Sequence, residues 1–450
     1  MSSFLFPPGF KWGVATSSYQ IEGAVAEDGR GVSIWDTFSR TPGRTLNGDT
    51  GDIACDHYHR WPQDVALMAE LGIQTYRFSI NWPRILPNGR GEINQSGLDF
   101  YDRLVDGLLE SGINPMPTLY HWELPQPLDD EGGWPLRATT EAFADYAGVV
   151  AARLGDRVSD WITHNEPWCS SFLSYQLGVH APGHRNWKEA IQASHHLLLS
   201  HGLAAAAIRS EVAEPRIGIA VNFEPAYPAS DTPEARAAAD RYGGYFYRWF
   251  LDPLFGRGYP QDIVDHYSAQ GHLPDGMHFV EDGDLEAISQ PIDFLGINYY
   301  TRHLSEPNET LDHQSAVRDP GVELTDMTWE VVPDAFERLL IWIASEYRPT
   351  EMLITENGCS YPDGPGTDGR VQDDRRIHYL DQHIAAVHRA LEAGAPISGY
   401  LQWSFMDNFE WTLGYSQRFG IVHVDFDTQT RTPKDSAYWY RDVIARNGLM

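Results

Sequence analysis

Short apolar runs alternate with amphipathic stretches along nearly the whole chain. The runs predict buried strands over residues 10–18, 75–80, 114–120, 158–163, 216–222, 292–299, 352–355 and 397–404. Between them, apolar residues at helical spacing predict helices over 61–71, 98–110, 141–154, 187–210, 234–255, 336–347, 374–393 and 436–447. Residues 24–51 are crowded with Gly, Asp and Arg, which predicts a long loop.

Strands that alternate with helices are typical of a parallel sheet, and eight repeats predict closure into a (β/α)8 TIM barrel of the α/β class. The competing interpretation is a doubly wound open sheet, but the sequence has no GxGxxG phosphate turn and nothing that marks a switch point. No linker-like or low-complexity stretch occurs, so we expect residues 1–450 to form a single barrel domain with long βα loops. In such barrels the C-terminal ends of the strands carry the active site.

Two of the predicted strands end in a glutamate followed by a turn signal. The sequence WITHNEP places Glu166 directly before Pro167, which disfavours the helical region and predicts an extended Glu166. The sequence MLITENG places Glu356 before an Asn-Gly turn. Taken alone, the first pattern also fits a strand-terminating turn with an exposed glutamate. Because both glutamates are presented alike, we predict a pair of carboxylates that work together across the barrel mouth.

The amino-acid composition indicates which kinds of molecule the protein can bind. Hydrophobic residues make up 42% of the chain and aromatic residues 12%, with 15 Trp, which suffices for a large core and is typical of sites where sugars stack on rings. A formal net charge of −30 argues against nucleic acid and anionic membranes as partners. The sequence has no apolar segment of bilayer length, and its start, MSSFLFPPGF, lacks the basic region of a signal peptide. We therefore expect a cytoplasmic protein.

The cysteines and several histidines suggest no metal site. Cys55, Cys169 and Cys359 lie far apart without CxxC spacing, which indicates neither a zinc site nor a disulfide framework. His57 and His59 form an HxH pattern like that of metal-dependent barrel hydrolases, but they lead into a predicted helix instead of ending a strand. His195, His196 and His201 lie on an Ala- and Leu-rich helix, where packing is expected, and the acidic run 281–286 is expected to face solvent.

Seven ordered motifs resemble those of glycoside hydrolase family 1, the family of retaining β-glucosidases. They are FPPGFKWGVATSSYQIEGA, YRFSINWPRI, TLYHWELPQPL, WITHNEP, GINYY, LITENG and GYLQWSFMDNFEW, and they follow the family's order and spacing over essentially the full length. The resemblance implies hydrolysis of a small β-glucoside or oligosaccharide without a cofactor or metal. One minor departure is Cys359 after ENG, where larger apolar residues are commoner, and we expect no functional effect from it.

The resemblance also implies a role for each matching residue. Glu166 matches the general acid/base, Glu356 the nucleophile, and Asn165 the residue that bonds the sugar 2-hydroxyl. Residues expected beside the nucleophile are Arg77, Asn298 and Tyr300; residues expected to hold the sugar are Gln20, His121, Trp122, Trp403, Glu410 and Trp411; residues expected on the leaving-group side are Trp168 and Trp329. Our hypothesis is that Arg77 and Tyr300 stabilise ionised Glu356, whose charge keeps Glu166 protonated, which predicts a bell-shaped pH profile.

Two features bear on the substrate. Glu410 can bond two sugar hydroxyls and its charge would repel a 6-phosphate, so unphosphorylated β-glucosides, with β-galactosides and β-fucosides tolerated, are favoured over 6-phospho-β-glucosides. Because Glu166 stands where thioglucosidases have Gln, an O-glycosidase is favoured. A carbohydrate-binding protein built on an inactive hydrolase would lack one of the two carboxylates. The sequence shows no interface, and a homo-oligomer stays open.

Overall fold

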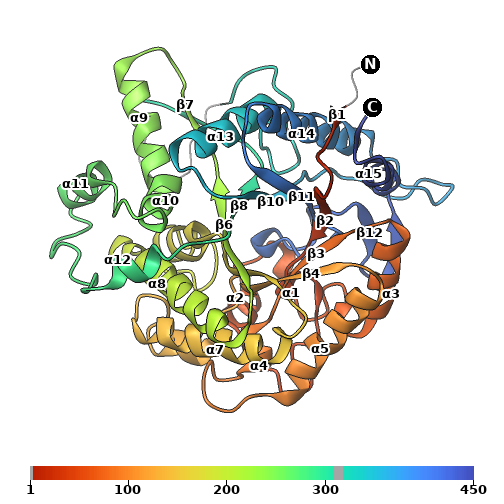
Figure 1. Ribbon diagram of the computed structural model, residues 1–450, viewed down its shortest axis with the longest axis horizontal. Helices are drawn as coiled ribbons and strands as arrows, with labels where there is room; N and C mark the ends of the chain where they lie inside the picture. Colours follow the sequence, from red (N-terminus) through yellow and green to blue (C-terminus); the bar gives the residue numbers. More distant parts are fainter. Residues whose placement is uncertain (1–3, 308–317) are drawn as a thin grey trace.

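The computed structural model describes residues 4–307 and 318–450 (Figure 1). Two segments lie outside these described residues: 1–3 and 308–317. The first begins the stretch that we predicted not to be a signal peptide, and the second is part of the predicted single domain. Within the two described ranges, every helix is too short or too polar to cross a lipid bilayer.

A closed barrel of parallel strands forms the centre of the molecule, which confirms the predicted fold class. Its strands are β2 (Lys11–Ala15), β3 (Thr75–Ser79), β4 (Asn114–Tyr120), β5 (Asp160–Asn165), β6 (Arg216–Phe223), β8 (Phe294–Tyr299), β10 (Met352–Asn357) and β11 (Ile397–Trp403). They pair in chain order, and β11 closes the ring against β2, with Trp403 opposite Ala15. Each predicted strand is present, because buried parallel strands show as near-continuous apolar runs.

Helices surround the barrel, as Figure 1 shows. The longer ones are α3 (His57–Glu70), α5 (Gln95–Glu110), α7 (Ala138–Leu154), α8 (Trp187–Glu211), α9 (Pro233–Gly243), α11 (Gln261–Ala269), α13 (Pro333–Glu346), α14 (Asp374–Glu392) and α15 (Asp435–Arg446). Short helices are α1 (Ser18–Ile21), α2 (Ile34–Arg40), α4 (Trp82–Ile85), α6 (Gln126–Asp130), α10 (Trp249–Leu254) and α12 (Asp284–Ile288). Strands outside the barrel pair as β1 (Phe4–Leu5) with β14 (Gly448–Leu449), β7 (Ala226–Pro228) with β9 (His303–Ser305), and β12 (Val422–Asp425) with β13 (Thr430–Pro433).

Two element predictions were wrong in detail. The predicted loop 24–51 contains α2, which begins with a capping box: the Ser33 side chain accepts a bond from the Asp36 backbone, and the Asp36 carboxylate accepts one from the Ser33 backbone. The predicted helix 234–255 is divided into α9 and α10 by a π-helical turn at Gly244–Arg248. Such turns insert one extra residue and are frequent beside functional sites.

Alternate residues on the barrel strands share the inner face and change from apolar to polar toward the mouth. Six side chains, each from a different strand, form a buried apolar cluster: Met116, Ile162, Ala220, Phe294, Leu353 and Leu401. Because side chains alternate along a strand, the residues two positions further on occupy the same face. These residues include Thr118, Asn222 and Trp403, so polar and aromatic groups collect at the C-terminal end of the barrel.

Candidate active site

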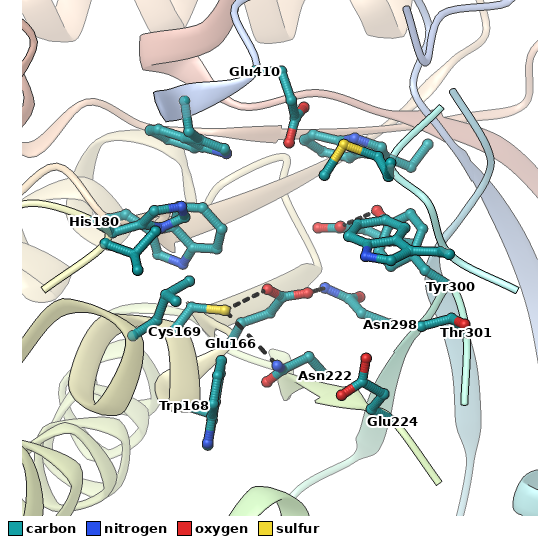
Figure 2. A pocket seen from close by; sticks show the side chains of 18 of the residues that line it. Glu166, Trp168, Cys169, His180, Asn222, Glu224, Asn298, Tyr300, Thr301 and Glu410 are labelled. Atoms are coloured by element: carbon teal, nitrogen blue, oxygen red, sulfur yellow. Dashed lines mark hydrogen bonds between the residues drawn. The ribbon is translucent and has the colours of Figure 1, made fainter. Parts of the chain in front are cut away.

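A cavity of about 390 Å³ opens at the C-terminal ends of the barrel strands (Figure 2). All but three of the residues predicted for the site line it: His121, Trp122, Glu166, Trp168, Asn298, Tyr300, Trp329, Glu356, Trp403, Glu410 and Trp411. The exceptions, Gln20, Arg77 and Asn165, are fully buried and contact the lining residues from behind.

Three residues that line the cavity have a left-handed backbone. The φ angles are +85° at Trp122, +51° at Glu166 and +49° at Trp411. The prediction that Pro167 holds Glu166 extended was therefore wrong: the proline excludes the right-handed helical region, and Glu166 takes the left-handed one instead. Non-glycine residues in this region are strained, and the surrounding structure holds them there.

Glu356 is held by positively polarised donors on both carboxylate oxygens. The Arg77 guanidinium donates to Oε1 over 2.6 Å, and the Tyr300 hydroxyl donates to Oε2 over 2.7 Å. Burial raises the pKa of Glu356, while Arg77 and then Tyr300 lower it. The contacts thus favour the ionised form, as hypothesised, although burial outweighs them.

Glu166 has a different set of partners. Asn298 donates to its Oε1 over 2.7 Å, and the Cys169 thiol lies 3.2 Å from its Oε2. Burial, followed by the charge of Glu356, raises the pKa of Glu166 to about 8. Two like charges in one cavity cannot both ionise cheaply, so the carboxyl without a cation in contact retains its proton.

Asn165 connects the two carboxyl groups from below. Its Oδ1 accepts bonds from Arg77 over 2.6 Å and from Asn298 over 3.0 Å, and its Nδ2 lies 3.1 Å from Nε2 of His121. Burial, and then Arg77, lower the pKa of His121 well below its ordinary value, so the imidazole is neutral and Nε2 accepts. The hydrogen bonds with Arg77, Asn298 and His121 therefore fix the orientation of the Asn165 amide.

Aromatic rings form one wall of the cavity. Trp122 and Trp411 lie with ring centroids 4.5 Å apart, and His121 stacks on Trp403 at 5.7 Å. Trp329 lies 5.3 Å from Tyr300 on another side. Apolar ring faces beside a few convergent polar groups are typical of sites that bind sugars.

Glu410 is a further carboxyl group that lines the cavity. Burial, and then the charges of Glu356 and Glu166, raise the pKa of Glu410 to about 8. Behind it, the Gln20 amide donates to the Phe409 carbonyl over 2.8 Å and to Asn408 over 3.0 Å. Gln20 therefore anchors the loop that presents Glu410.

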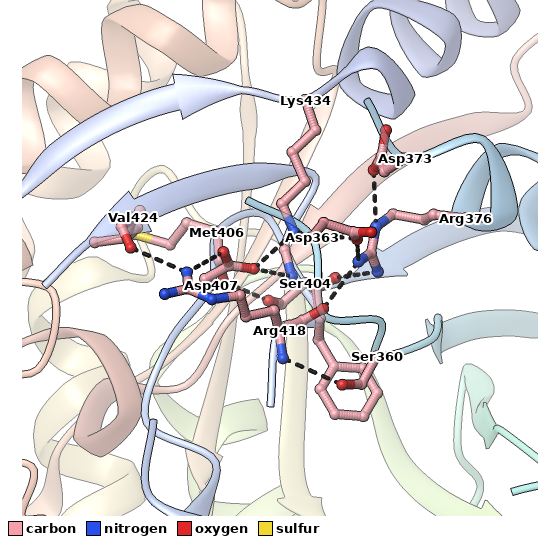
Figure 3. Close-up of polar contacts among 12 residues, drawn as sticks. Ser360, Asp363, Asp373, Arg376, Ser404, Met406, Asp407, Arg418, Val424 and Lys434 are labelled. Atoms are coloured by element: carbon pink, nitrogen blue, oxygen red, sulfur yellow. Dashed lines mark hydrogen bonds and ion pairs between the residues drawn. The ribbon is translucent and has the colours of Figure 1, made fainter. Parts of the chain in front are cut away.

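A buried network of charges supports the loops that follow β10 and β11 (Figure 3). Asp407 accepts bonds from Lys434, which lies between β13 and α15, over 3.0 Å, from Arg418 over 2.8 Å and from the Gly420 backbone over 3.0 Å. Arg376 donates to the carbonyl of Cys359, three residues after Glu356, and to that of Phe419. The network thus ties the Glu356 segment to the Glu410 segment.

Several lining residues were missed from the sequence: Cys169, Leu173, Val179, His180, Asn222, Phe223, Glu224, Phe246, Thr301, Met327, Thr412, Leu413 and Phe419. β6 ends at Phe223, between Asn222 and Glu224. The strand-end rule that selected Glu166 therefore also selects these two residues. Cys169 lies one helical turn after Glu166, which is a signal for contact. His180 and Met327 come from loops whose course no local pattern predicts.

Two of the histidines considered for metal binding, His57 and His195, are buried and bonded within the protein. The predicted helix 61–71 begins earlier, at His57, and the interpretation of this segment as a solvated helix entry was wrong for His57: it is buried, and its Nδ1 lies 2.8 Å from Asp64, which also accepts from Arg431. His195 is buried and pairs with Asp284 over 2.9 Å. The expectation that the acidic run 281–286 faces solvent was therefore wrong for Asp284, which is 2% exposed. In the described part of the chain, no three His, Cys, Asp or Glu side chains are grouped to hold a metal ion.

Comparisons with known proteins agree with this geometry. The chain is 46% identical to "Beta-glucosidase A" of Acetivibrio thermocellus, with 100% of both sequences covered. It is 47% identical to a "Bifunctional beta-D-glucosidase/beta-D-fucosidase" of Bifidobacterium breve, covering 98% of this chain and 99% of that one. Among solved structures it is similar to the family 1 β-glucosidase of Thermotoga maritima in complex with isofagomine lactam, with a TM-score of 0.95, 46% identity and 100% of both chains covered.

The family model described as "Glycosyl hydrolase family 1" matches residues 2–449. The match includes both strand-end glutamates and the segments that carry the cavity wall. This chain belongs to glycosyl hydrolase family 1.

Proposed function

We propose that the protein is a retaining β-glucosidase that hydrolyses terminal non-reducing β-D-glucosyl residues of cellobiose, short cello-oligosaccharides and aryl β-glucosides. The observation that carries the proposal is that Glu166 and Glu356 line one cavity with opposite partners. The names of the relatives support the sugar, and the β-fucosidase activity named for one of them supports acceptance of β-fucosides as well as β-galactosides.

In the first half-reaction the ionised Glu356 carboxylate attacks the anomeric carbon, and Glu166 gives its proton to the glycosidic oxygen as the bond to the leaving group breaks. Arg77 and Tyr300 lower the pKa of Glu356 against the effect of burial, and so favour its ionised form for this step. The product is a glycosyl ester of Glu356. Forming the ester removes the charge that raised the pKa of Glu166, so Glu166 then accepts a proton from the water that hydrolyses the ester.

The sugar is held by the groups that surround this pair. We assign the 2-hydroxyl to Asn165, whose position Arg77 and Asn298 fix. The remaining sugar contacts are assigned to Gln20, His121, Trp122, Trp403, Glu410 and Trp411, and the leaving-group side to Trp168 and Trp329. Of these, Gln20 acts from behind, through the loop that it anchors.

Two alternatives are less favoured. A 6-phospho-β-glucosidase would place a phosphate beside Glu410, in a cavity that already holds the carboxyls of Glu166 and Glu356. A catalytically weak carbohydrate-binding protein would have no use for two carboxyls with such different partners. Our proposal includes a cytoplasmic location, supported by the three buried free thiols, which suit a reducing compartment.

The test is hydrolysis of p-nitrophenyl β-glycosides with the first-formed anomer followed by proton NMR. We expect the β-glucoside, β-galactoside and β-fucoside to be cleaved, the 6-phospho-β-glucoside to be spared, and β-glucose to appear first. Initial release of α-glucose would mean inversion and a different mechanism. Absence of turnover with tight glucoside binding would favour the binding protein.

A further inference from the structure

The Cys169 thiol is in contact with the carboxyl group that the proposed function makes the acid/base. Cys169 begins the π-helical segment Cys169–Gln176, one turn after Glu166, and it lines the cavity. Its sulfur lies 3.2 Å from Oε2 of Glu166, and Figure 2 shows it on the side of the carboxyl away from Asn298.

The hydrogen bonds around Glu166 determine which oxygen carries the proton. Oε1 accepts the Asn298 N–H over 2.7 Å, so the proton of the neutral acid is on Oε2. The Asn222 amide donates to the Cys169 sulfur over 3.8 Å, which leaves the thiol hydrogen free to point at Oε2. Cys169 is therefore a donor at the oxygen that loses and regains the proton.

We propose that Cys169 is a positioning residue for the reaction: its S–H bond to Oε2 stabilises the Glu166 carboxylate as the proton passes to the leaving group. The inference rests on the proposed function, because it requires Glu166 to be the acid. The thiol keeps its own hydrogen throughout. In the first half-reaction the Oε2 proton moves to the glycosidic oxygen, which receives the electron pair of the breaking bond, and in the second half water returns a proton to Oε2.

Other titratable and charged groups that face Glu166 also influence its pKa. They are Glu356 on β10, Arg77 on β3, Tyr300 after β8 and Glu410 after β11, and the charge of Glu224 after β6 acts on the Cys169 thiol. Arg77 bonds to Glu356 and Asn165, and Tyr300 bonds to Glu356, so neither donates to Glu166. The Cys169 bond lowers the pKa of Glu166, against burial and the Glu356 charge. Loss of the thiol should raise that pKa.

The chain contains a matched control. Cys359 follows Glu356 by the same three residues as Cys169 follows Glu166, and it is also buried. Its sulfur accepts a bond from the Arg376 guanidinium over 3.8 Å, in the network behind the cavity. Removing this thiol tests the general effect of losing a buried cysteine beside a catalytic strand.

The experiment compares kcat/KM for aryl β-glucosides whose leaving groups range from dinitrophenol, which needs no proton, to phenol, which does. Cys169→Ala and Cys169→Val should lower kcat/KM for the phenyl glucoside about fivefold, leave the dinitrophenyl glucoside unchanged, and move the basic limb of the pH profile upward. Cys169→Ser, which keeps a donor, should restore both properties. Cys359→Ala should change neither.

Glu166→Ala is measured in the same series to separate two failures. It should show a steep leaving-group dependence, and a flat dependence would overturn the proposed role of Glu166 itself. If that variant behaves as expected while Cys169→Val slows all glucosides equally with an unmoved basic limb, Cys169 only packs and the inference fails. Should Cys169→Ala not fold, the Val and Ser variants, which fill the space, decide the question.

Discussion

Glu166 and Glu356 stand at equivalent strand ends, but only Glu356 touches a cation. The Arg77 guanidinium and the Tyr300 hydroxyl each bond one of its oxygens, whereas Glu166 is bonded by a neutral amide and a thiol. Both carboxyl groups are therefore positioned in the same way, at the C-terminal ends of barrel strands, whereas their protonation states depend on the side chains that bond to each. A carboxylate beside a fixed positive charge loses its proton first.

The residues behind the direct partners of the two glutamates also differ: they are charged near Glu356 and aromatic near Glu166. Behind Glu356 lies the ionic network of Arg376, Asp407 and Lys434, whereas Trp168, next to the Glu166 segment, packs on Phe246 with centroids 4.3 Å apart. Fixed charges and dipoles stabilise an ion, and apolar rings favour a neutral acid. The paired charges thus lie on the Glu356 side of the cavity and the apolar rings on the Glu166 side.

Removal of each carboxyl group in turn should have the largest effect on activity, and it tests whether Glu166 and Glu356 have the different roles proposed here. Glu356→Ala should lose about ten-thousandfold in kcat, and added azide should then give α-glucosyl azide by a single displacement from the dinitrophenyl glucoside. Glu166→Ala should still form the glycosyl-enzyme, and azide should give the β product by a second displacement. NMR of the products distinguishes the two; the same anomer from both variants would refute the assignment.

Removal of the cation should have the next largest effect on activity. Arg77→Met leaves Glu356 without its charged partner, so its pKa rises, and the acid limb of the pH profile moves to higher pH because the nucleophile must be ionised. We expect kcat to fall about a hundredfold, as when a preorganised charge is lost. Steady-state kinetics across pH measure both changes. As a control, Arg137→Met breaks an ion pair with Asp284 outside the cavity and should leave the limb unmoved.

The ionic network around Asp407 should affect the free energy of unfolding more than the catalytic rate. Lys434→Met removes one partner of the buried Asp407 carboxylate, and we expect a loss of about 3 kcal/mol in the free energy of unfolding, measured by urea denaturation. Lys188→Met, which breaks an exposed pair with Asp275, serves as the control and should leave the midpoint unchanged. Equal stability of both variants would mean that Arg418 alone satisfies Asp407.

The strands and both glutamates were predictable because apolar runs and turn signals are local, and the barrel rule brings strand ends together. The backbone of Glu166 was not, since a following proline excludes one region without selecting among the others. The burial of Asp284 depends on Arg137 and His195, which are distant in sequence. Loop residues such as His180 line the cavity through long-range packing, for which the sequence carries no periodic signal.

The smallest of these effects tests whether Tyr300 belongs to the Glu356 side of the comparison. Its hydroxyl donates to Oε2 of Glu356 over 2.7 Å and lowers the pKa of that carboxyl, although Glu166 also lies close enough to raise the pKa of Tyr300. Tyr300→Phe should lower kcat about tenfold and move the acid limb of kcat/KM to higher pH, with the basic limb fixed. Movement of the basic limb instead would show that Tyr300 acts on Glu166, and the division of partners between the two glutamates would fail.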